Sequence, residues 1–262
     1  MDGNGKIFDR ALYRKRRTRA VKEWGQYDFL KREAAQRLGE CLDDITRTFP
    51  LALDLGCHSG ILPELLGRKG GVGRWISCDL AENFNPQVVC DEEFLPFADN
   101  TFDLIVSALS LHHVNDLPGT FIQIKRALKP DGLFLAILPG ANTLKELRMS
   151  ITGASAEKGF PLSPRIAPFV EVRDAGALLM RAGFALPVAD SDTIEVNYPD
   201  SFALMLDLQG MGESNVLLSQ HKGCTPPGQL AATGDYYQTH YALDDGTIPA
   251  TFEFITMTGW KS

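Results

Sequence analysis

Alternation of short apolar segments with helical patterns is the feature that most constrains the fold of this chain. The apolar segments lie at 51–55, 73–78, 87–90, 102–108 and 132–138, and helical patterns lie at 28–48, 61–67 and 118–128. Strands that alternate with helices in this way are joined by crossover connections, which produce a parallel sheet. The first half of the chain is therefore predicted to be an α/β sheet with helices on both faces.

The second half of the chain shows a different order of elements. Residues 141–150, 171–182 and about 200–240 have helical patterns, residues 159–168 form a predicted loop, and residues 190–197 and 250–258 form predicted strands. A late, nearly antiparallel strand pair would complete a seven-stranded, Rossmann-like sheet. We expect a single domain over 1–262, with an N-terminal helical segment (1–50), a cofactor-binding core (51–140) and a C-terminal half (141–262) with helices that cover the site.

Charge and hydropathy exclude several classes of protein. The net charge is −7, so no nucleic-acid partner is expected. The basic stretch 14–19 is an exception, and it is either a solvated segment or a contact for an anionic partner or a cofactor carboxylate. No run of about 18 apolar residues is present, which predicts no transmembrane span. The five cysteines are odd in number and lack C-x-x-C spacing, which argues against a disulfide framework and a thiolate zinc site.

A glycine-containing turn follows the first predicted strand and is the main candidate for a cofactor site. It reads Asp54-Leu-Gly-Cys-His-Ser-Gly60. The dinucleotide pattern G-x-G-x-x-G fails here at two of its three glycines. The pattern acidic-x-G-x-G-x-G, typical of S-adenosylmethionine sites, matches Asp54, Gly56 and Gly60 and fails only at His58. We therefore expect S-adenosylmethionine rather than NAD, with the His58 ring turned outward and its backbone in the left-handed region that histidine tolerates.

Two aspartates follow the next two predicted strands. A carboxylate at Asp79 can accept hydrogen bonds from both hydroxyls of a ribose, whereas a surface aspartate is the alternative. Asp91 is a candidate acceptor for the adenine amino group, or part of a solvated acidic turn with Glu92 and Glu93.

Several motifs give the chain a family resemblance. The segments 52–56, 91–97, 100–107, 109–112 and 128–132 resemble class I methyltransferases, a superfamily that includes the malonyl-carrier methyltransferase of the biotin pathway. The segments 7–12, 114–118 and 207–215 are similar to the family of mitochondrial respiratory complex I assembly factor five and its bacterial relatives, a likeness that extends from about residue 7 to Trp260.

The resemblance carries expectations about cofactor, partner and site. It implies a seven-stranded class I methyltransferase fold, S-adenosylmethionine as cofactor, and a role in complex I assembly that is associated with arginine hydroxylation on an iron–sulfur subunit. The family's motif positions fall on Asp54, Gly56, Gly60, Asp79 and Asp91. The chain departs from the family pattern at His58 and also at His113, where an aromatic residue is usual.

The candidate catalytic residues are His112 and His113, which follow the fourth predicted strand. Either ring is a possible general base, or both pack and hydrogen-bond near the cofactor. With Asp116 they provide metal-ligand types, but their spacing does not mark a metal triad, so no metal is predicted. Glu213, in a glycine-flanked turn at 210–215, is a candidate partner for a guanidinium or lies in an ordinary turn between helices.

The favoured function is S-adenosylmethionine-dependent methyl transfer to a protein, with a respiratory complex I subunit as the expected partner. Three alternatives stay open: an arginine hydroxylase, a small-molecule or carrier-protein methyltransferase, and a non-catalytic cofactor-binding assembly factor. The expected compartment is the cytoplasm for a bacterial protein, or the mitochondrial matrix or inner-membrane periphery for a processed eukaryotic one. Oligomeric state is left open.

Overall fold

The computed structural model describes residues 5–220, 223 and 225–262. Its centre is a seven-stranded sheet in the order β3-β2-β1-β4-β5-β7-β6, which confirms the predicted Rossmann-like architecture. The strands are β1 (Leu51–Leu55), β2 (Arg74–Asp79), β3 (Val88–Val89), β4 (Phe102–Ala108), β5 (Leu128–Pro139), β6 (Ala185–Tyr198) and β7 (Ile248–Trp260).

Strand direction brings several chain segments together at one edge of the sheet. The strands from β3 to β5 pair in parallel, and β7 runs antiparallel between β5 and β6. Asp54 in β1 lies level with Ser77 in β2 and with Val106 in β4. The carboxyl ends of these strands therefore meet, which is where ligands bind in open α/β sheets.

Helices cover both faces of the sheet. The α-helices are α1 (Arg10–Ala20), α2 (Phe29–Asp43), α3 (Ile61–Leu66), α4 (Leu117–Ala127), α5 (Lys145–Lys158), α6 (Val172–Arg181), α7 (Ser201–Gly210) and α8 (Pro227–Tyr241). Short 3-10 helices lie at Trp24–Gln26, Lys69–Gly71, Glu82–Phe84 and Leu111–His113.

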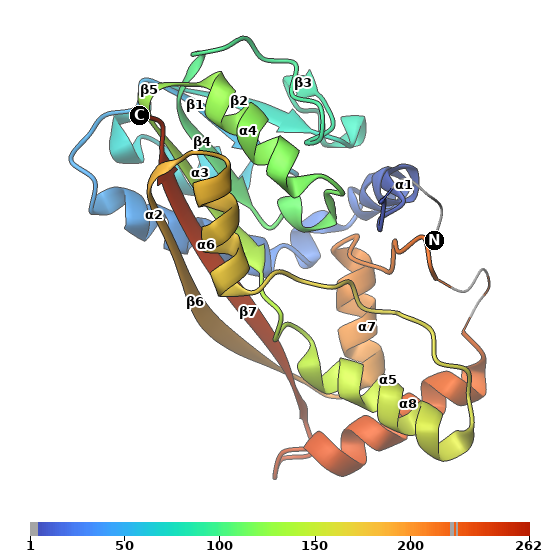
Figure 1. The fold of residues 1–262 in the computed structure, drawn as a ribbon. Helices are drawn as coiled ribbons and strands as arrows, with labels where there is room; N and C mark the ends of the chain where they lie inside the picture. The colour runs from blue at the N-terminus through green and yellow to red at the C-terminus, as the bar shows by residue number, and fades with distance from the viewer. Residues whose placement is uncertain (1–4, 221–222, 224) are drawn as a thin grey trace.

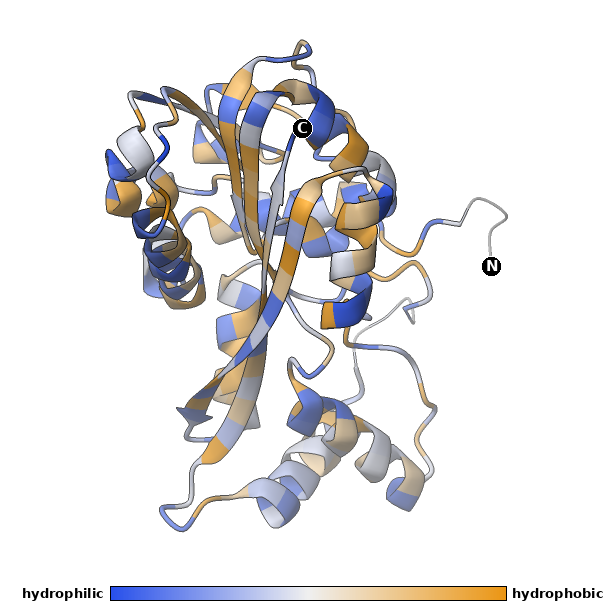
Figure 2. Ribbon diagram, turned by 60° about the vertical axis from the view of Figure 1, so that its left-hand side comes forward, coloured by the Kyte–Doolittle hydropathy of each residue, from blue (hydrophilic) through white to orange (hydrophobic). Residues whose placement is uncertain are grey.

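The two largest apolar cores of the described residues lie one on each face of the sheet. Alternate strand residues point to opposite faces, so Ala52 packs with α2 and α3, whereas Leu53 packs with α4 and α6. Figure 2 shows the strands of the sheet as largely hydrophobic and the helices as mixed in hydropathy. The first half of the chain, where strands and helices alternate most clearly, thus forms the predicted sheet with helices on both faces.

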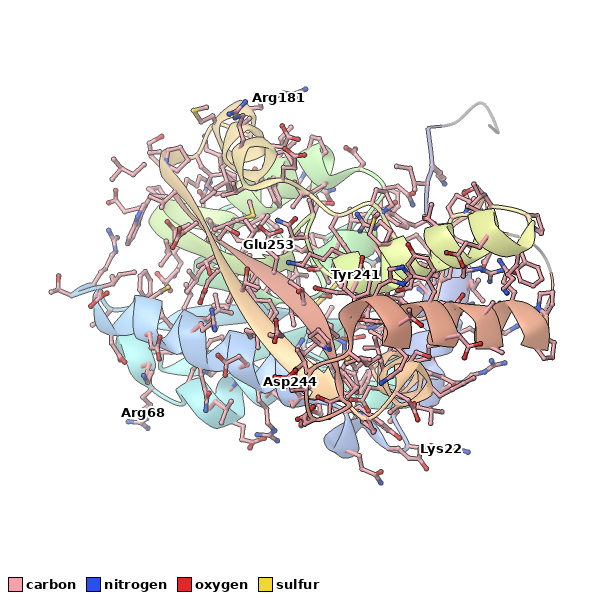
Figure 3. The ribbon with its side chains drawn as sticks, turned by 90° about the horizontal axis from the view of Figure 1, so that it is seen from below. Lys22, Arg68, Arg181, Tyr241, Asp244 and Glu253 are labelled. Carbon is pink, nitrogen blue, oxygen red and sulfur yellow. A yellow bond between two sulfur atoms is a disulfide. The ribbon has the colours of Figure 1, made fainter. Side chains whose placement is uncertain are left out.

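The helices α5, α7 and α8 gather beside the far end of the long strands β6 and β7 (Figure 1). Glu253 in β7 helps to fix this region, because its carboxylate accepts hydrogen bonds from the Asn142 backbone at 2.8 Å and from Ser191 Oγ at 2.6 Å. Figure 3 shows Glu253 beside these two strands, while Lys22, Arg68 and Arg181 lie at the periphery. The loop after β5 is thereby held against β7.

Three features differ from the sequence-based expectations. Helix α1 shows no clear apolar periodicity in the sequence. The connection between the predicted helix at 118–128 and the predicted strand at 132–138 lies within the bounds of β5, where Asp131 has a φ of 58°. The structure also joins Cys78 and Cys90 in a disulfide, because the parallel pairing of β2 with β3 brings them together; the argument against disulfides was wrong for this pair. Within the described ranges, no helix is long and apolar enough to cross a membrane.

Candidate cofactor and substrate site

The turn after β1 has the backbone geometry that its glycines predict. Gly56 and Gly60 have φ angles of 75° and 80°, in the left-handed region that glycine adopts without strain. A Cβ atom on Gly56 would lie 1.8 Å from Ser110 Oγ, so a side chain does not fit there. The backbone N–H groups of Gly56 and Cys57 donate to the carbonyl oxygen of Cys78, which fixes the turn against the end of β2.

Asp54 is a buried carboxylate at the end of β1. Neither of its oxygens has a hydrogen-bond partner among the residues that the structure describes. Burial raises the pKa of Asp54, and the neighbouring Lys31 ammonium opposes that rise. A buried carboxylate without a donor is costly, and a ligand ammonium or hydroxyl would satisfy it.

Lys31 crosses from α2 into the same site. Its Nζ donates to the carbonyl oxygens of Gly56 and Ala108, the latter at 3.0 Å. Burial lowers the pKa of Lys31, and the carboxylate of Asp54 works against that change. Lys31 therefore links the glycine turn to the end of β4. The sequence pattern did not single it out, since it lies on the apolar side of a helix.

Asp79 already has three donors in this structure. Its Oδ1 accepts from the Ala81 backbone N–H at 2.8 Å, and its Oδ2 accepts from the His58 backbone N–H at 2.8 Å and from the Arg17 guanidinium. Arg17 and Asp79 are both buried. The carboxylate expected to accept ribose hydroxyls is therefore held by an arginine of α1.

Asp91 is held by the same helix. Arg10 Nη2 donates to Asp91 Oδ1 at 2.6 Å and also to Glu92, whose side chain is 1% exposed. Ser110 Oγ donates to the other oxygen of Glu92 at 2.9 Å. Asp91 was interpreted either as an acceptor for the adenine amino group or as part of a solvated acidic turn. A fully solvated turn does not describe the segment, because Glu92 is buried.

The basic segment 14–19 divides between the two interpretations given for it. Arg14, Lys15 and Arg19 are exposed, as a solvated segment requires, whereas Arg17 is buried. Tyr13 Oη accepts a hydrogen bond from Arg17 at 3.0 Å. Arg17 thus contacts an anionic group of the protein itself, the carboxylate of Asp79.

The expected outward orientation of His58 is wrong. The side chain is 2% exposed, and its ring stacks on Trp24 with ring centroids 4.4 Å apart. Burial, together with the charges of Arg17 and Lys31, lowers its pKa well below the usual value. Its Nδ1 lies 2.6 Å from Lys31 Nζ and 3.0 Å from the carbonyl oxygen of Gly56. The left-handed backbone was predicted correctly, with a φ of 49°. The ring turns inward because an aromatic partner and a buried cation lie beside it.

A cavity of about 410 Å³ lies over the carboxyl ends of β1, β4 and β5. His58 and Leu109 line it from the strand ends, and Leu147 and Met205 line it from α5 and α7. Most of the wall is apolar, which is usual for pockets that enclose small ligands or side chains. The C-terminal helices therefore cover the site, as expected for the added helices of this fold.

His112 and His113 lie in this cavity wall together with Glu213. His112 Nε2 lies 2.8 Å from Glu213 Oε2, and His113 Nδ1 lies 3.5 Å from the same oxygen. Burial lowers the pKa of His113 to about 3, so its ring is neutral near pH 7. Burial would raise the pKa of Glu213, but the two histidines outweigh it and lower that pKa.

Glu213 was not predicted to lie with the two histidines; Asp116 was the carboxylate considered with them. Asp116, the local candidate, caps α4 by accepting from the Gly119 backbone N–H at 2.9 Å. Glu213 enters because α7 ends at Gly210 and the following turn, with Gly212 at a φ of 78°, brings the carboxylate to the cavity. Glu213 was expected to meet a guanidinium or to lie in an ordinary turn, and here it pairs with His112. Only the two glycines that precede it, Gly210 and Gly212, signalled an unusual turn.

The structure thus gathers the sequence-based candidates into two adjacent groups. Asp54, Gly56, Gly60, Asp79 and Asp91 lie around the glycine turn and the ends of β2 and β3. His112 and His113 lie in the cavity wall. His58, which follows Gly56, lines the same cavity and so connects the two groups.

Comparison with known proteins identifies related sequences over nearly the whole chain. Residues 53–136 match the family model described as a methyltransferase domain. The human protein named arginine-hydroxylase NDUFAF5, mitochondrial, is 45% identical over 97% of this chain and 77% of its own length. A malonyl-[acyl-carrier protein] O-methyltransferase from Methylovorus is 30% identical over 100% of this chain and 92% of its own length.

Solved structures agree with the fold. A SAM-dependent methyltransferase from Thermotoga maritima superimposes with a TM-score of 0.52 at 14% identity, and the match covers 95% of this chain and all of that one. At this level of identity the likeness concerns the arrangement of strands and helices.

Proposed function

Because the chain belongs to the family of the NDUFAF5 arginine hydroxylases, enzymes with a methyltransferase fold, we propose that it binds S-adenosylmethionine and hydroxylates an arginine side chain of a respiratory complex I subunit. The cofactor follows from the fold and the residues of the glycine turn. The arginine and the complex I partner follow from the relatives and from the family resemblance of the sequence.

The observation that carries the proposal is the shared cavity. His58 brings the glycine turn to its wall, and His112, His113 and Glu213 form another part of the wall. An arginine side chain has an apolar stem and a planar cation, and aromatic faces bind both. Trp24, Tyr27 and Phe169 are aromatic residues of the cavity wall, and one face of Trp24 is already stacked on His58. A guanidinium side chain in this cavity would therefore lie next to the glycine turn, on the far side of His58 from the cofactor carboxylates.

The residues present fit the polar groups of S-adenosylmethionine. The unpartnered oxygens of Asp54 would accept from its ammonium group, Asp79 from its ribose and Asp91 from its adenine amino group. When bound, the cofactor supplies an electrophilic methyl group on a sulfonium. Asp79 and Asp91 now accept from Arg17 and Arg10, so the cofactor has to share or replace those donors.

Hydroxylation has a simple balance. A C–H bond of the arginine side chain is replaced by a C–O–H unit, with dioxygen as the oxidant. One oxygen atom enters the product, and the other leaves as water with two protons and two electrons from an external two-electron reductant. The apolar cavity wall favours this chemistry because it limits access of water to the reacting group.

Methyl transfer is the second candidate, favoured by the methyltransferase-domain match over residues 53–136. A guanidinium nitrogen would attack the sulfonium methyl group, the methyl–sulfur bond would break to leave a thioether, and the nitrogen would lose a proton. His112, which lines the cavity, is the candidate base, because the low pKa of His113 makes that ring a poor proton acceptor. The name of the Methylovorus relative states methyl transfer to malonyl-carrier protein. A malonyl carboxylate is an anion, whereas the guanidinium substrate proposed here is a cation.

Co-expression with candidate complex I subunits, followed by peptide mass spectrometry, tests the proposal. We expect one arginine to gain one oxygen atom, and Asp54→Asn to reduce that gain at least tenfold. The exposed variant Asp244→Asn is the control. A gained methyl group would favour the second candidate instead. An unmodified subunit, with assembly of the complex still dependent on the chain, would contradict both and favour a non-catalytic assembly factor.

A further inference from the structure

The cluster of His112, His113 and Glu213 has the composition and spacing of a metal site. One ligand atom from each residue can be chosen so that all three lie within 4.8 Å of one another. Glu213 is remote from the histidines in sequence, and it reaches them through the turn after α7. Three donors from two distant segments thus converge on one point of the cavity wall.

Two of the three separations between these atoms are close to those of neighbouring ligands on one ion. First-row divalent metals bind imidazole nitrogen and carboxylate oxygen at about 2.0–2.2 Å, so adjacent ligands of an octahedral ion lie about 3 Å apart. The two observed nitrogen–oxygen separations are 2.8 and 3.5 Å. An ion would therefore fit between these groups with small side-chain rotations.

The polar atoms of the cluster are incompletely paired. His113 Nδ1 is buried and has no hydrogen-bond partner among the described residues, although it faces Glu213. The His113 ring is held by edge contacts with Phe8 and Tyr13, at centroid distances of 5.1 and 4.6 Å. A buried polar atom that is fixed in place and unpaired has a desolvation cost that a metal bond would offset.

We propose that His112, His113 and Glu213 bind one divalent first-row transition metal ion, with Fe²⁺ as the expected ion. Two histidines and one carboxylate with open positions form the ligand set typical of non-haem Fe²⁺ oxygenases. Three protein ligands leave further coordination positions, and these face the cavity that the same residues line. The site departs from the expectation of no metal, because Glu213 replaces Asp116 as the carboxylate.

The metal site stands on this geometry alone, and it deepens the proposed hydroxylation by placing an oxygen-reactive ion where the arginine would lie. The test therefore measures metal binding directly. Chelator-treated protein is titrated without oxygen, with Co²⁺ followed by absorption spectroscopy and with Fe²⁺ followed by calorimetry. We expect one equivalent of each metal to bind, with visible Co²⁺ bands that indicate nitrogen and oxygen ligands.

Variants then locate the bound ion. His112→Ala and Glu213→Gln should each weaken metal binding at least 100-fold, because even groups that only support a ligand alter affinity by about 10–100-fold. His240→Ala is the matched control, since His240 is exposed on α8 outside the cavity, and it should bind as the parent does. Glu213→Gln keeps the size of the side chain, and circular dichroism checks that each variant folds.

Two results would overturn the metal site: no saturable binding of either metal, or equal binding by the parent and by Glu213→Gln. Mass spectrometry of the arginine substrate on the same samples separates this inference from the proposed function. Metal bound at the cluster without arginine modification would contradict the function alone. Modification that persists in Glu213→Gln after metal is lost would support the metal site but would contradict a role for the ion in the hydroxylation.

Discussion

The ion pair between Arg17 and Asp79 permits a quantitative prediction. Arg17→Met removes a guanidinium that is fully buried against a buried carboxylate. Breaking such a pair from one side leaves an uncompensated charge and costs about 3–5 kcal/mol of unfolding free energy. Arg17 also donates to Tyr13 Oη, so we expect the upper part of that range. Arg19→Met, an exposed change on the same helix, should alter stability by about 0.5 kcal/mol or less.

A double variant separates the ion pair from simple packing loss. Arg17→Met with Asp79→Asn removes both charges, so the pair should lose at least about 2 kcal/mol less than the sum of the single variants. The assay is urea unfolding at pH 7 followed by circular dichroism. If Arg17→Met costs less than about 1 kcal/mol, or if the two changes are additive, the buried ion pair does not hold α1 against the sheet and this reasoning is refuted.

Three further predictions follow from the same site. Gly56→Ala should destabilise the fold by more than about 3 kcal/mol, because the new Cβ would meet Ser110. Gly60→Ala should cost only the roughly 1–2 kcal/mol of a left-handed backbone, because space is open around Gly60. Equal losses in thermal unfolding would contradict the contact with Ser110. His58 should make stability fall by up to about 1.4 kcal/mol per pH unit below about pH 6.5. Its pKa is depressed in the folded state, so the unfolded chain binds the proton first as the pH drops. His58→Gln should flatten this slope, and an unchanged slope would exclude His58 as its source. His58→Gly should lower stability by about 1–3 kcal/mol, because the stack on Trp24 and the contact with Lys31 are lost. An unaltered melting temperature would show that neither contact matters.

Local patterns predicted the sheet and the glycine turn, because both depend on neighbouring residues. Gly56 and Gly60 were identifiable from their place after β1, and each has the backbone that only glycine adopts freely. Asp79 and Asp91 were placed correctly at the ends of β2 and β3. Strand–helix alternation is likewise visible within short windows of sequence.

Contacts between distant segments were beyond the reach of those patterns. Arg17 reaches Asp79 across 62 residues, and Glu213 reaches His112 across 101. Helix α1 was predicted only as part of the helical segment 1–50, without bounds of its own, because its buried side is Tyr13, Arg17 and Ala20 and a charged residue conceals the helical spacing. Asp79, which the sequence indicates only as a ribose acceptor, also holds Arg17, so Asp79→Ala should lower stability as well as cofactor affinity.

The central claim is that the glycine turn and its carboxylates bind S-adenosylmethionine, and calorimetric titration tests it most directly. The parent protein should release or absorb heat with S-adenosylmethionine at one equivalent and show no binding of NAD. Asp54→Asn should weaken the binding at least tenfold, because a charged acceptor for the ligand ammonium is worth about 1.5–3 kcal/mol. Binding of NAD alone, or S-adenosylmethionine affinity unchanged in Asp54→Asn, would contradict the account.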